Sequence, residues 1–306
     1  SVKPKLSDAK VATGYYYLTT ALSGSKRAIT VKDASYFGGA KTEIQNYGGH
    51  GSQKWYIKSI GSGYYLLRCA RSDNYLDVRG TSKKKAIIQQ TYLSSASKAT
   101  NSQKFKIKQA TVNGKVYYYF IPKTSSKYMI DVHGSKNKNG ADLILWKANS
   151  ASKAVRFNLT ATTWSNSSTR SGSDTFVQVD LSLQKLVLFV NGAKKLESNV
   201  ITGRPSKPTP TGNFHVILIA KNYTMNGPAS DPYHSFCKYV AKFKDNGYYM
   251  HDASWQNWSK RAKTGASYRK THGSHGCVNM PTSAAKKLYD TLKAVKTMKT
   301  PVIITK

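Results

Sequence analysis

The pattern of hydrophobic and polar positions divides the chain near residue 160. Before that point, short runs of Tyr, Ile, Leu and Val alternate with turns of Gly, Ser, Asn and Lys, which is typical of β-strands. Three strand-like segments recur in the same order three times, at 14–18, 29–31, 43–47, 63–67, 76–78, 87–91, 117–121, 130–132 and 143–146. This internal repeat predicts three structural units of similar design.

A related motif marks the fourth strand of each unit. The motif reads Gln53-Lys54-Trp55 in the first unit and Gln103-Lys104-Phe105 in the second. The third unit ends with a degenerate version, Val155-Arg156-Phe157. The aromatic positions are 50 and 52 residues apart. Three units of four strands predict a β-trefoil over residues 1–160, in which no unit can bury its apolar face alone. The repeat resembles that of the ricin-type lectins, whose fourth strand carries Gln-x-Trp.

That resemblance implies sugar-binding positions. Asp77 and Asp131 occupy the place that ricin-type lectins use to hold sugar hydroxyls, whereas the first unit has Thr30 there. An aromatic residue of the third strand usually stacks on the sugar, and Tyr47 and Trp146 are suited to this role. The third unit, with Asp131 and Trp146, is the best candidate. The alternative is that these residues only pack and that the trefoil binds no sugar.

The pattern changes after residue 160. Residues 161–173 are polar and rich in Ser, which predicts a linker to a second domain at 174–306. In this domain strands are expected at 175–180, 185–190, 199–202, 213–219 and 301–305. Leu288 and Leu292 lie four residues apart and predict a helix from about Thr282, which can cap it, to about Ala294. The second domain is therefore mainly β with one or two helices.

The stretch Gly273-Ser274-His275-Gly276-Cys277-Val278-Asn279-Met280-Pro281 carries the sharpest chemical signal. A nucleophilic thiol needs a base, because a free Cys titrates near ~8.5 and holds little thiolate at neutral pH. It also needs hydrogen-bond donors for the oxyanion that forms. Glycine beside Cys277 allows backbone N–H groups to approach a reacting carbonyl. Cys277 is thus a candidate nucleophile, although an inert buried thiol is the alternative.

The same stretch resembles the signature of YkuD-type L,D-transpeptidases, in which a His precedes [Ser/Thr]-His-Gly-Cys-x-Asn. The matching upstream residue is His251, and the loop 208–214 looks like the family's Thr-Pro-x-Gly loop. The resemblance implies a β-sandwich-like domain, with Cys277 as nucleophile and His251 as general base and acid. Asp252 would orient His251 through its main chain or its carboxylate.

Further roles follow from the resemblance. His275 would line the site, Ser274 would help to hold substrate or His251, and Gly276 and Cys277 would supply the oxyanion N–H donors. The 22 residues between His251 and Ser274 are more than the family leads us to expect, and they indicate a longer flap at 256–271. The implied reaction acts on peptidoglycan tetrapeptide stems, releases the terminal D-Ala and forms 3→3 cross-links. No cofactor and no metal are expected.

Composition and charge indicate what kind of partner the protein binds. The chain has 306 residues and a net charge of +34, which predicts a polyanionic partner or medium. Residues 1–160 hold 27 Lys and Arg against 7 Asp and Glu, and residues 161–306 hold 21 against 7, so the charge is spread over both domains. With the wall-active signature, this favours the anionic cell wall, with teichoic-acid-like polymers, over nucleic acid. Three distant Cys residues imply no disulfide framework.

Other interpretations stay open at this point. The chain opens without a basic and apolar leader, so it is either cytosolic or processed, and secretion with wall association is the expectation. No apolar run is long enough for a membrane span, and a monomer is expected. One alternative is an L,D-carboxypeptidase or endopeptidase of the same fold. Another is a non-catalytic protein that binds polyanions or sugars, and a metal site at His251, His272, His275 and Cys277 is a third.

Overall fold

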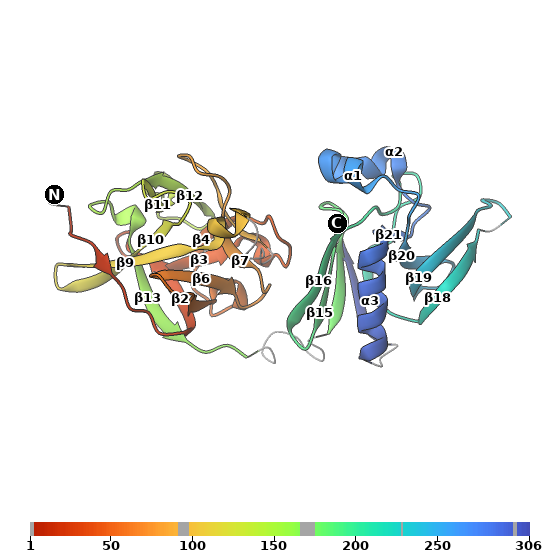
Figure 1. Ribbon diagram of the computed structural model, residues 1–306, viewed down its shortest axis with the longest axis horizontal. Coiled ribbons are helices and arrows are strands. Elements are labelled where there is room, and N and C mark those ends of the chain that lie inside the picture. The colour runs from red at the N-terminus through yellow and green to blue at the C-terminus, as the bar shows by residue number, and fades with distance from the viewer. Residues whose placement is uncertain (1–2, 91–97, 166–174, 228, 296–298) are drawn as a thin grey trace. The chain divides into compact units, whose positions relative to one another are not determined.

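The computed structural model describes residues 3–90, 98–165, 175–227, 229–295 and 299–306, which fall into two compact units, 1–169 and 170–306 (Figure 1). Most of the expected linker at 161–173 lies outside the described residues. Its first two residues belong to strand β13 (Phe157–Thr162), which continues the ladder of the first unit. Among the described residues, no helix is long and apolar enough to cross a membrane.

Six strands of the first unit close into a barrel. They are β2 (Gly14–Thr20), β5 (Trp55–Ser59), β6 (Tyr64–Cys69), β9 (Phe105–Val112), β10 (Lys115–Pro122) and β13. Each pairs antiparallel with its neighbours in this order, and β13 pairs back to β2. A short strand, β1 (Ser7–Asp8), adds to β9. Because the ring is closed, it leaves no unpaired edge.

Three hairpins cap the barrel, one from each repeat. They are β3 (Arg27–Val31) with β4 (Thr42–Asn46), β7 (Tyr75–Val78) with β8 (Ile87–Gln90), and β11 (Tyr128–Val132) with β12 (Ala141–Lys147). Short 3-10 turns lie at η1 (Lys32–Ala34), η2 (Gly51–Gln53), η3 (Lys98–Gln103), η4 (His133–Ser135) and η5 (Lys153–Val155). The predicted β-trefoil is thereby confirmed.

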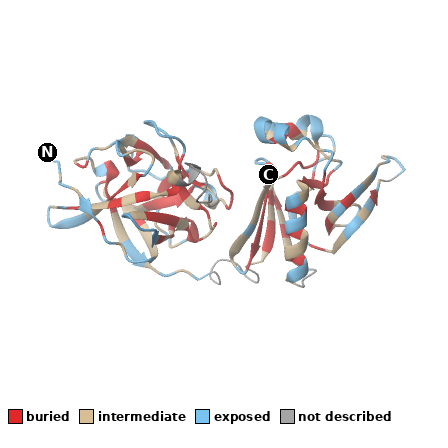
Figure 2. Cartoon of the chain, viewed as in Figure 1, coloured by how far each residue is buried: buried red, intermediate tan, exposed pale blue. Residues whose placement is uncertain are grey.

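The repeated aromatic residues explain why the trefoil needs all three units. Trp55, Phe105 and Phe157 are completely buried in one apolar core, to which strands of every repeat contribute (Figure 2). The indole N–H of Trp55 donates to the carbonyl of Ile29, 3.1 Å away, so that its one polar atom is satisfied. Burial of side chains of this size contributes about 1.5–3 kcal/mol each.

The second unit has two sheets around one core. The first is β16 (Ala193–Asn199), β15 (Lys185–Val190), β14 (Phe176–Asp180), β22 (Pro301–Thr305) and β17 (Gly212–His215), in that order. The second is β18 (Leu218–Asn226), β19 (His234–Lys244), β20 (Tyr248–Asp252) and β21 (Val278–Met280). Apolar residues of both sheets share a core with helix α3 (Thr282–Ala294), as the expected sandwich requires.

Several sequence predictions for this unit need correction. The segment 199–202 is not a strand; the edge strand is β16, whose side chains are too polar to give an apolar pattern. The segment 213–219 divides between β17 and β18, which belong to different sheets. Helix α3 has the expected bounds, but Pro281 is its N-cap and no side chain caps it, so Thr282 is its first residue.

Candidate active site

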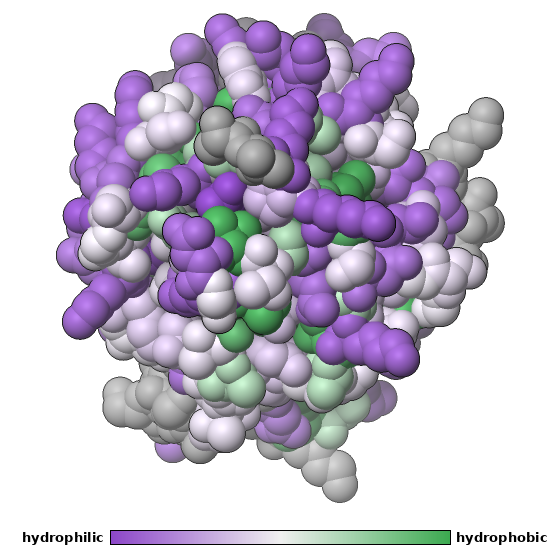
Figure 3. Space-filling view, turned by 90° about the vertical axis from the view of Figure 1, so that its left-hand side faces the viewer, coloured by the Kyte–Doolittle hydropathy of each residue, from purple (hydrophilic) through white to green (hydrophobic). Residues whose placement is uncertain are grey.

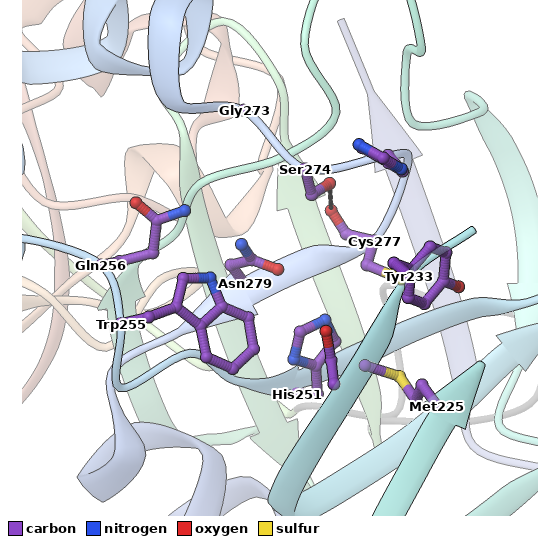
Figure 4. Close-up of a pocket in the computed structure, with 11 residues that line it drawn as sticks. Met225, Tyr233, His251, Trp255, Gln256, Gly273, Ser274, Cys277 and Asn279 are labelled. Atoms are coloured by element: carbon purple, nitrogen blue, oxygen red, sulfur yellow. Dashed lines mark hydrogen bonds between the residues drawn. The ribbon is translucent and has the colours of Figure 1, made fainter. Parts of the chain in front are cut away.

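Two neighbouring strands bring the key residues together. Strands β20 and β21 are parallel, and their register places His251 opposite Asn279, two residues after Cys277. His251 and Cys277 line the same cavity of about 210 Å³, although they are 26 positions apart in the sequence (Figure 4). The expected pairing of an upstream His with the Cys motif is therefore a feature of the structure.

Two further segments supply walls of the cavity. Met225 and Tyr233 come from the β18–β19 hairpin, and Trp255 and Gln256 from the segment that follows β20 (Figure 4). Trp255 is 53% exposed and lies with its ring centre 6.0 Å from that of His251. An exposed Trp at a cavity entrance offers an apolar surface to a bound chain.

His251 is held in one tautomer. Its Nδ1 lies 2.8 Å from the carbonyl oxygen of Asp252. Because a carbonyl only accepts, Nδ1 carries the hydrogen and Nε2 is the basic nitrogen. Burial lowers the pKa of His251, so the ring is neutral at neutral pH. The Asp252 carboxylate does not orient the ring; it accepts from the backbone N–H of Tyr239 at 2.8 Å.

Cys277 is a protonated thiol in this environment. Burial raises its pKa to about 11, and its Sγ–H donates to the carbonyl of Gly247 at 3.4 Å. A buried thiol beside a buried neutral imidazole favours the uncharged pair over a thiolate–imidazolium pair, because burial penalises both charges. Nucleophilic attack from this state requires His251 Nε2 to take the thiol proton as the new bond forms.

Hydrogen bonds within the turn fix the approach to Cys277. Ser274 Oγ accepts from the N–H of Gly276 at 3.0 Å and donates to the carbonyl of Cys277 at 2.6 Å. The N–H of Gly276, expected as an oxyanion donor, is thus engaged within the turn. The Ser274 hydroxyl is therefore bonded to the backbone of the turn and not to His251. Thr209 adds a second brace, because its hydroxyl donates to the carbonyl of Gly276 at 2.8 Å.

Glycine is required at position 276. Its φ is +121°, which side chains rarely adopt, and a Cβ there would lie 2.7 Å from a ring carbon of Tyr248. The same need for close approach applies at Gly273, where a Cβ would meet the backbone of Arg204 at 2.5 Å. These contacts explain the two glycines that flank Ser274 and His275 in the motif.

His275 has a carboxylate as its partner. Its Nδ1 is 2.9 Å from a carboxylate oxygen of Asp231, and its ring meets that of Tyr233 edge-on. Lys207 also contacts Asp231, and this contact lowers the pKa of the Asp231 carboxyl. Burial and nearby Arg204 lower the pKa of His275. His275 lines the cavity as expected, with a carboxylate rather than Cys277 as its partner.

A second thiol touches the base. Cys237 is fully buried on β19, and its Sγ lies 3.3 Å from Nδ1 of His251. Burial raises its pKa to about 12, so it remains a neutral thiol against the imidazole. The sequence gave no sign of this contact. The register of β19 and β20, which no local motif encodes, creates it.

The long segment before the motif is helical. It contains α1 (Trp258–Thr264), the 3-10 turn η7 (Gly265–Tyr268) and α2 (Arg269–His272). Buried Arg261 anchors it, donating to the carbonyls of Val200 at 3.1 Å and Gln184 at 2.7 Å. The expected flap is therefore tied to the domain body. Sequence reasoning missed Arg261 because an Arg in a polar helix usually lies in solvent.

The trefoil places its expected sugar residues differently in each repeat. In the first, Gln53 Nε2 donates to Thr30 Oγ1 at 3.2 Å, and Tyr47 is stacked on Tyr17 with ring centres 3.8 Å apart. In the second, burial raises the pKa of Asp77, while hydrogen bonds from Ser102 and Gln103 oppose that shift.

The third repeat lacks this hydrogen-bond partner. Val155 replaces the motif Gln, and burial raises the pKa of Asp131 to about 7, with no opposing contact from the residues that the structure describes. Trp146 and Asp131 come from paired strands, but Lys83 Nζ lies over the Trp146 ring, 4.1 Å from its centre. The ring face on which a sugar would stack is therefore shared with a cation.

No metal cluster is found in the described part of the chain, where no three His, Cys, Asp or Glu side chains gather as ligands. His272, considered as a ligand, instead stacks on Tyr268 with ring centres 4.1 Å apart and bonds Thr271.

Comparison with known families agrees with both units. Residues 174–304 match the model of the L,D-transpeptidase catalytic domain, YkuD, and residues 6–91 and 51–146 match the ricin-type β-trefoil lectin domain-like family. The second unit therefore belongs to the L,D-transpeptidase catalytic-domain family, and the first matches the model of the ricin-type β-trefoil lectin-like domain. Both resemblances drawn from the motifs are confirmed. None of the curated proteins compared matches the chain significantly.

Solved structures resemble one unit or the other. An Enterococcus faecium L,D-transpeptidase mutant is 33% identical over 43% of this chain and 50% of its own, with a TM-score of 0.38. The catalytic domain of the E. faecium enzyme acylated by ertapenem is 33% identical over 44% of this chain and 99% of its own, with a TM-score of 0.38. The designed three-fold symmetric protein ThreeFoil is 28% identical over 49% and 99%, with a TM-score of 0.43. The chain spans about half the length of the first two L,D-transpeptidases that it matches.

Proposed function

We propose that the protein is a secreted, wall-associated L,D-transpeptidase that acts on peptidoglycan tetrapeptide stems. Residues 174–306 would catalyse the reaction, residues 1–160 would bind the wall, and 161–173 would join them. The observation that carries the proposal is the placement of Cys277 and tautomer-fixed His251 at one cavity of an L,D-transpeptidase domain.

The first half-reaction forms a thioester. Cys277 Sγ attacks the carbonyl at the L-centre of the diamino residue, while His251 Nε2 takes the thiol proton. The main-chain N–H of Cys277 stabilises the oxyanion, since the N–H of Gly276 is bound to Ser274. As the tetrahedral intermediate collapses, the C–N bond to the terminal D-Ala breaks. His251 gives its proton to the leaving amine, so charge and atoms balance.

The second half-reaction resolves the thioester. An amine from a neighbouring stem attacks the thioester carbonyl and loses a proton to His251, and Cys277 leaves as the thiol after receiving that proton. The product is a 3→3 cross-link. Water in place of the amine gives L,D-carboxypeptidase activity. Ser274 and Gly276 act as positioning residues in the turn, Asp252 positions His251 through its carbonyl, and His275 borders the substrate cavity.

The trefoil is proposed to hold the enzyme on its substrate. Its basic surface suits the anionic wall, and Asp131 with Trp146, Asp77 and Tyr47 are its candidate sugar contacts. A monomer suffices for this mechanism, because Cys277 and His251 come from the same chain.

Acylation by a carbapenem tests the nucleophile directly. Intact mass after incubation with ertapenem is expected to show one adduct on the native chain and on the Cys69→Ala control, whose thiol is buried in the trefoil core. Cys277→Ala is expected to show none and to release no D-Ala from a tetrapeptide stem. An adduct on folded Cys277→Ala would refute the role of Cys277.

Product analysis separates transfer from hydrolysis. With a tetrapeptide stem as donor and a second stem as amine acceptor, the transpeptidase proposal predicts a cross-linked dimer and free D-Ala in equal amounts. If tripeptide accumulates unchanged as the acceptor concentration is raised, the enzyme is an L,D-carboxypeptidase.

A further inference from the structure

Two adjoining hollows on the trefoil form one groove; of the expected sugar positions Tyr47 lines it, whereas Asp77, Asp131 and Trp146 do not. They have volumes of about 600 and 590 Å³ and share Ser25, Lys26, Lys115 and Asn158. The loop from β2 to β3, the turn of the β9–β10 hairpin and strand β13 enclose this groove. No residue of the β11–β12 hairpin, which carries Asp131 and Trp146, lines either hollow.

The groove is cationic without compensation. Lys26, Lys115 and Lys153 line it, and neither hollow has an Asp or Glu in its lining. Arg156 lines it too, but its guanidinium donates to the carbonyls of Ser150 and Ala151. Within the described ranges, none of these four forms an ion pair, whereas Lys108 and Arg68 of the same domain pair with Asp8 and Asp73. The groove therefore differs from a surface that is merely hydrophilic, such as the face in Figure 3, which carries many hydrophilic side chains.

The groove also carries groups that suit the hydroxyl groups and carbon faces of a sugar or polyol. Asn158 donates from Nδ2 to Thr19 Oγ1 at 3.1 Å, while its Oδ1 is buried and has no hydrogen-bond partner in the described part of the chain. A buried acceptor that stays unsatisfied destabilises the protein. At the other end, Tyr17 and Tyr47 form a stacked pair, with ring centres 3.8 Å apart, that lines the groove. Stacked rings of this kind suit the carbon face of a sugar or polyol.

These features specify a ligand with regularly spaced negative charges and free hydroxyl donors. A neutral glycan would leave the three groove lysines without an anionic partner. We propose that the groove binds a linear wall polymer in which anionic groups alternate with hydroxylated units, either a poly(polyol phosphate) or a carboxylated polysaccharide. This rests on the proposed wall-binding role of the trefoil and is independent of the chemistry at Cys277.

A pair of charge-matched variants tests the groove. Lys26→Gln, Lys115→Gln and Lys153→Gln combined remove three groove cations. Lys58→Gln, Lys136→Gln and Lys138→Gln combined remove three exposed cations outside it, so the net charge falls equally. With the full chain and a poly(glycerol phosphate) oligomer at about 0.1 M salt, we expect the groove variant to bind at least 10-fold more weakly. The control should lose no more than about 2-fold, because screened charges outside the site contribute little. Equal losses in the two variants would overturn the proposal.

Other probes define the ligand class. Polygalacturonate supplies carboxylates in place of phosphates. The proposal is supported if either polymer, or both, binds the native chain and binds the groove variant more weakly. The polymer that binds shows whether phosphate or carboxylate groups are recognised. Single-stranded DNA of matched charge has far fewer hydroxyl donors. If DNA binds as tightly as the best polymer through the same lysines, the site is a general polyanion groove and the proposed ligand class is wrong. Absence of binding to every probe also overturns it.

Wall sedimentation separates this inference from the proposed function. If the native chain fails to sediment with purified cell walls, the wall-binding role itself fails. If it sediments, but the groove and control variants do so equally, only the groove assignment fails. The expected result is that the groove variant, and removal of anionic polymers from the walls, lower retention to a similar extent.

Discussion

The two domains treat buried titratable groups in opposite ways. In the catalytic domain, buried His251 and Cys277 each have a backbone carbonyl as partner, and both stay neutral and oriented toward one cavity. In the third repeat of the trefoil, Asp131 is equally buried but has lost the Gln that serves Asp77. A hydrogen-bond partner therefore fixes the orientation and protonation state of a buried group. Without such a partner, the charge of a buried carboxyl group depends on pH near neutrality.

Replacing the base gives the largest expected effect within this comparison. His251→Gln keeps a polar side chain but removes the nitrogen that accepts the Cys277 proton. We expect the rate of acylation by a carbapenem to fall by about 10²–10⁴-fold, the usual contribution of a general base. His275→Gln is the comparison variant and is expected to lose less than about 10-fold, because His275 pairs with Asp231. Similar losses in both would show that the base is misassigned.

The pH profile sharpens the same point. The pKa of His251 is lowered by burial and that of Cys277 is raised to about 11. The active form is neutral in both residues, so acylation should rise with pH through the lowered pKa of His251, below 6.5, and then stay level beyond pH 8. A thiolate–imidazolium pair would instead give a bell with a falling limb as the imidazolium loses its proton. Measuring acylation rates from pH 4.5 to 9 distinguishes the two.

A smaller loss is expected when the turn beside Cys277 is distorted. Gly276→Ala places a Cβ at φ +121° and 2.7 Å from Tyr248, and it displaces the neighbouring Cys277 N–H. We expect a 10- to 100-fold loss of acylation rate and about 1–3 kcal/mol of stability. Gly265→Ala is the matched control: its φ is +65°, but nothing lies within 4 Å of the added Cβ. It should lose stability only. Full activity in folded Gly276→Ala would contradict the positioning role.

Sequence patterns predicted the trefoil well because its information is local and repeated. Each strand has its own alternating run, and Trp55, Phe105 and Phe157 mark the register of the repeats. The strands of the catalytic domain were harder to predict from the sequence. The long hairpin β18–β19 and edge strand β16 carry polar side chains on one or both faces, so their strand period is hidden.

For the site, the local stretch 273–281 pointed to Cys277, and the order of residues in the family signature pointed to His251, although the segment between them is longer than the family leads us to expect. Contacts between residues on different strands or loops could not be predicted from the sequence. Cys237 meets His251 through the register of two long strands, and Thr209 reaches Gly276 from 67 positions away. Such contacts depend on tertiary packing, which a single sequence does not record.

Asp131 gives the smallest effect but tests the trefoil side of the comparison. Its folded pKa, about 7, lies above its ordinary value of 3.8, so the folded domain binds the proton more tightly than the unfolded chain does. Stability therefore falls as pH rises from about 4 to 7 and stays lower above that range. Asp131→Asn removes the ionisation, and it should raise the stability by about 1–3 kcal/mol at pH 8 and change it little at pH 5. Asp77→Asn is the control; because Ser102 and Gln103 stabilise its carboxylate, it should gain less at pH 8. Thermal unfolding of each variant at both pH values measures the difference, and equal gains for the two Asp residues would show that the missing Gln has no energetic consequence.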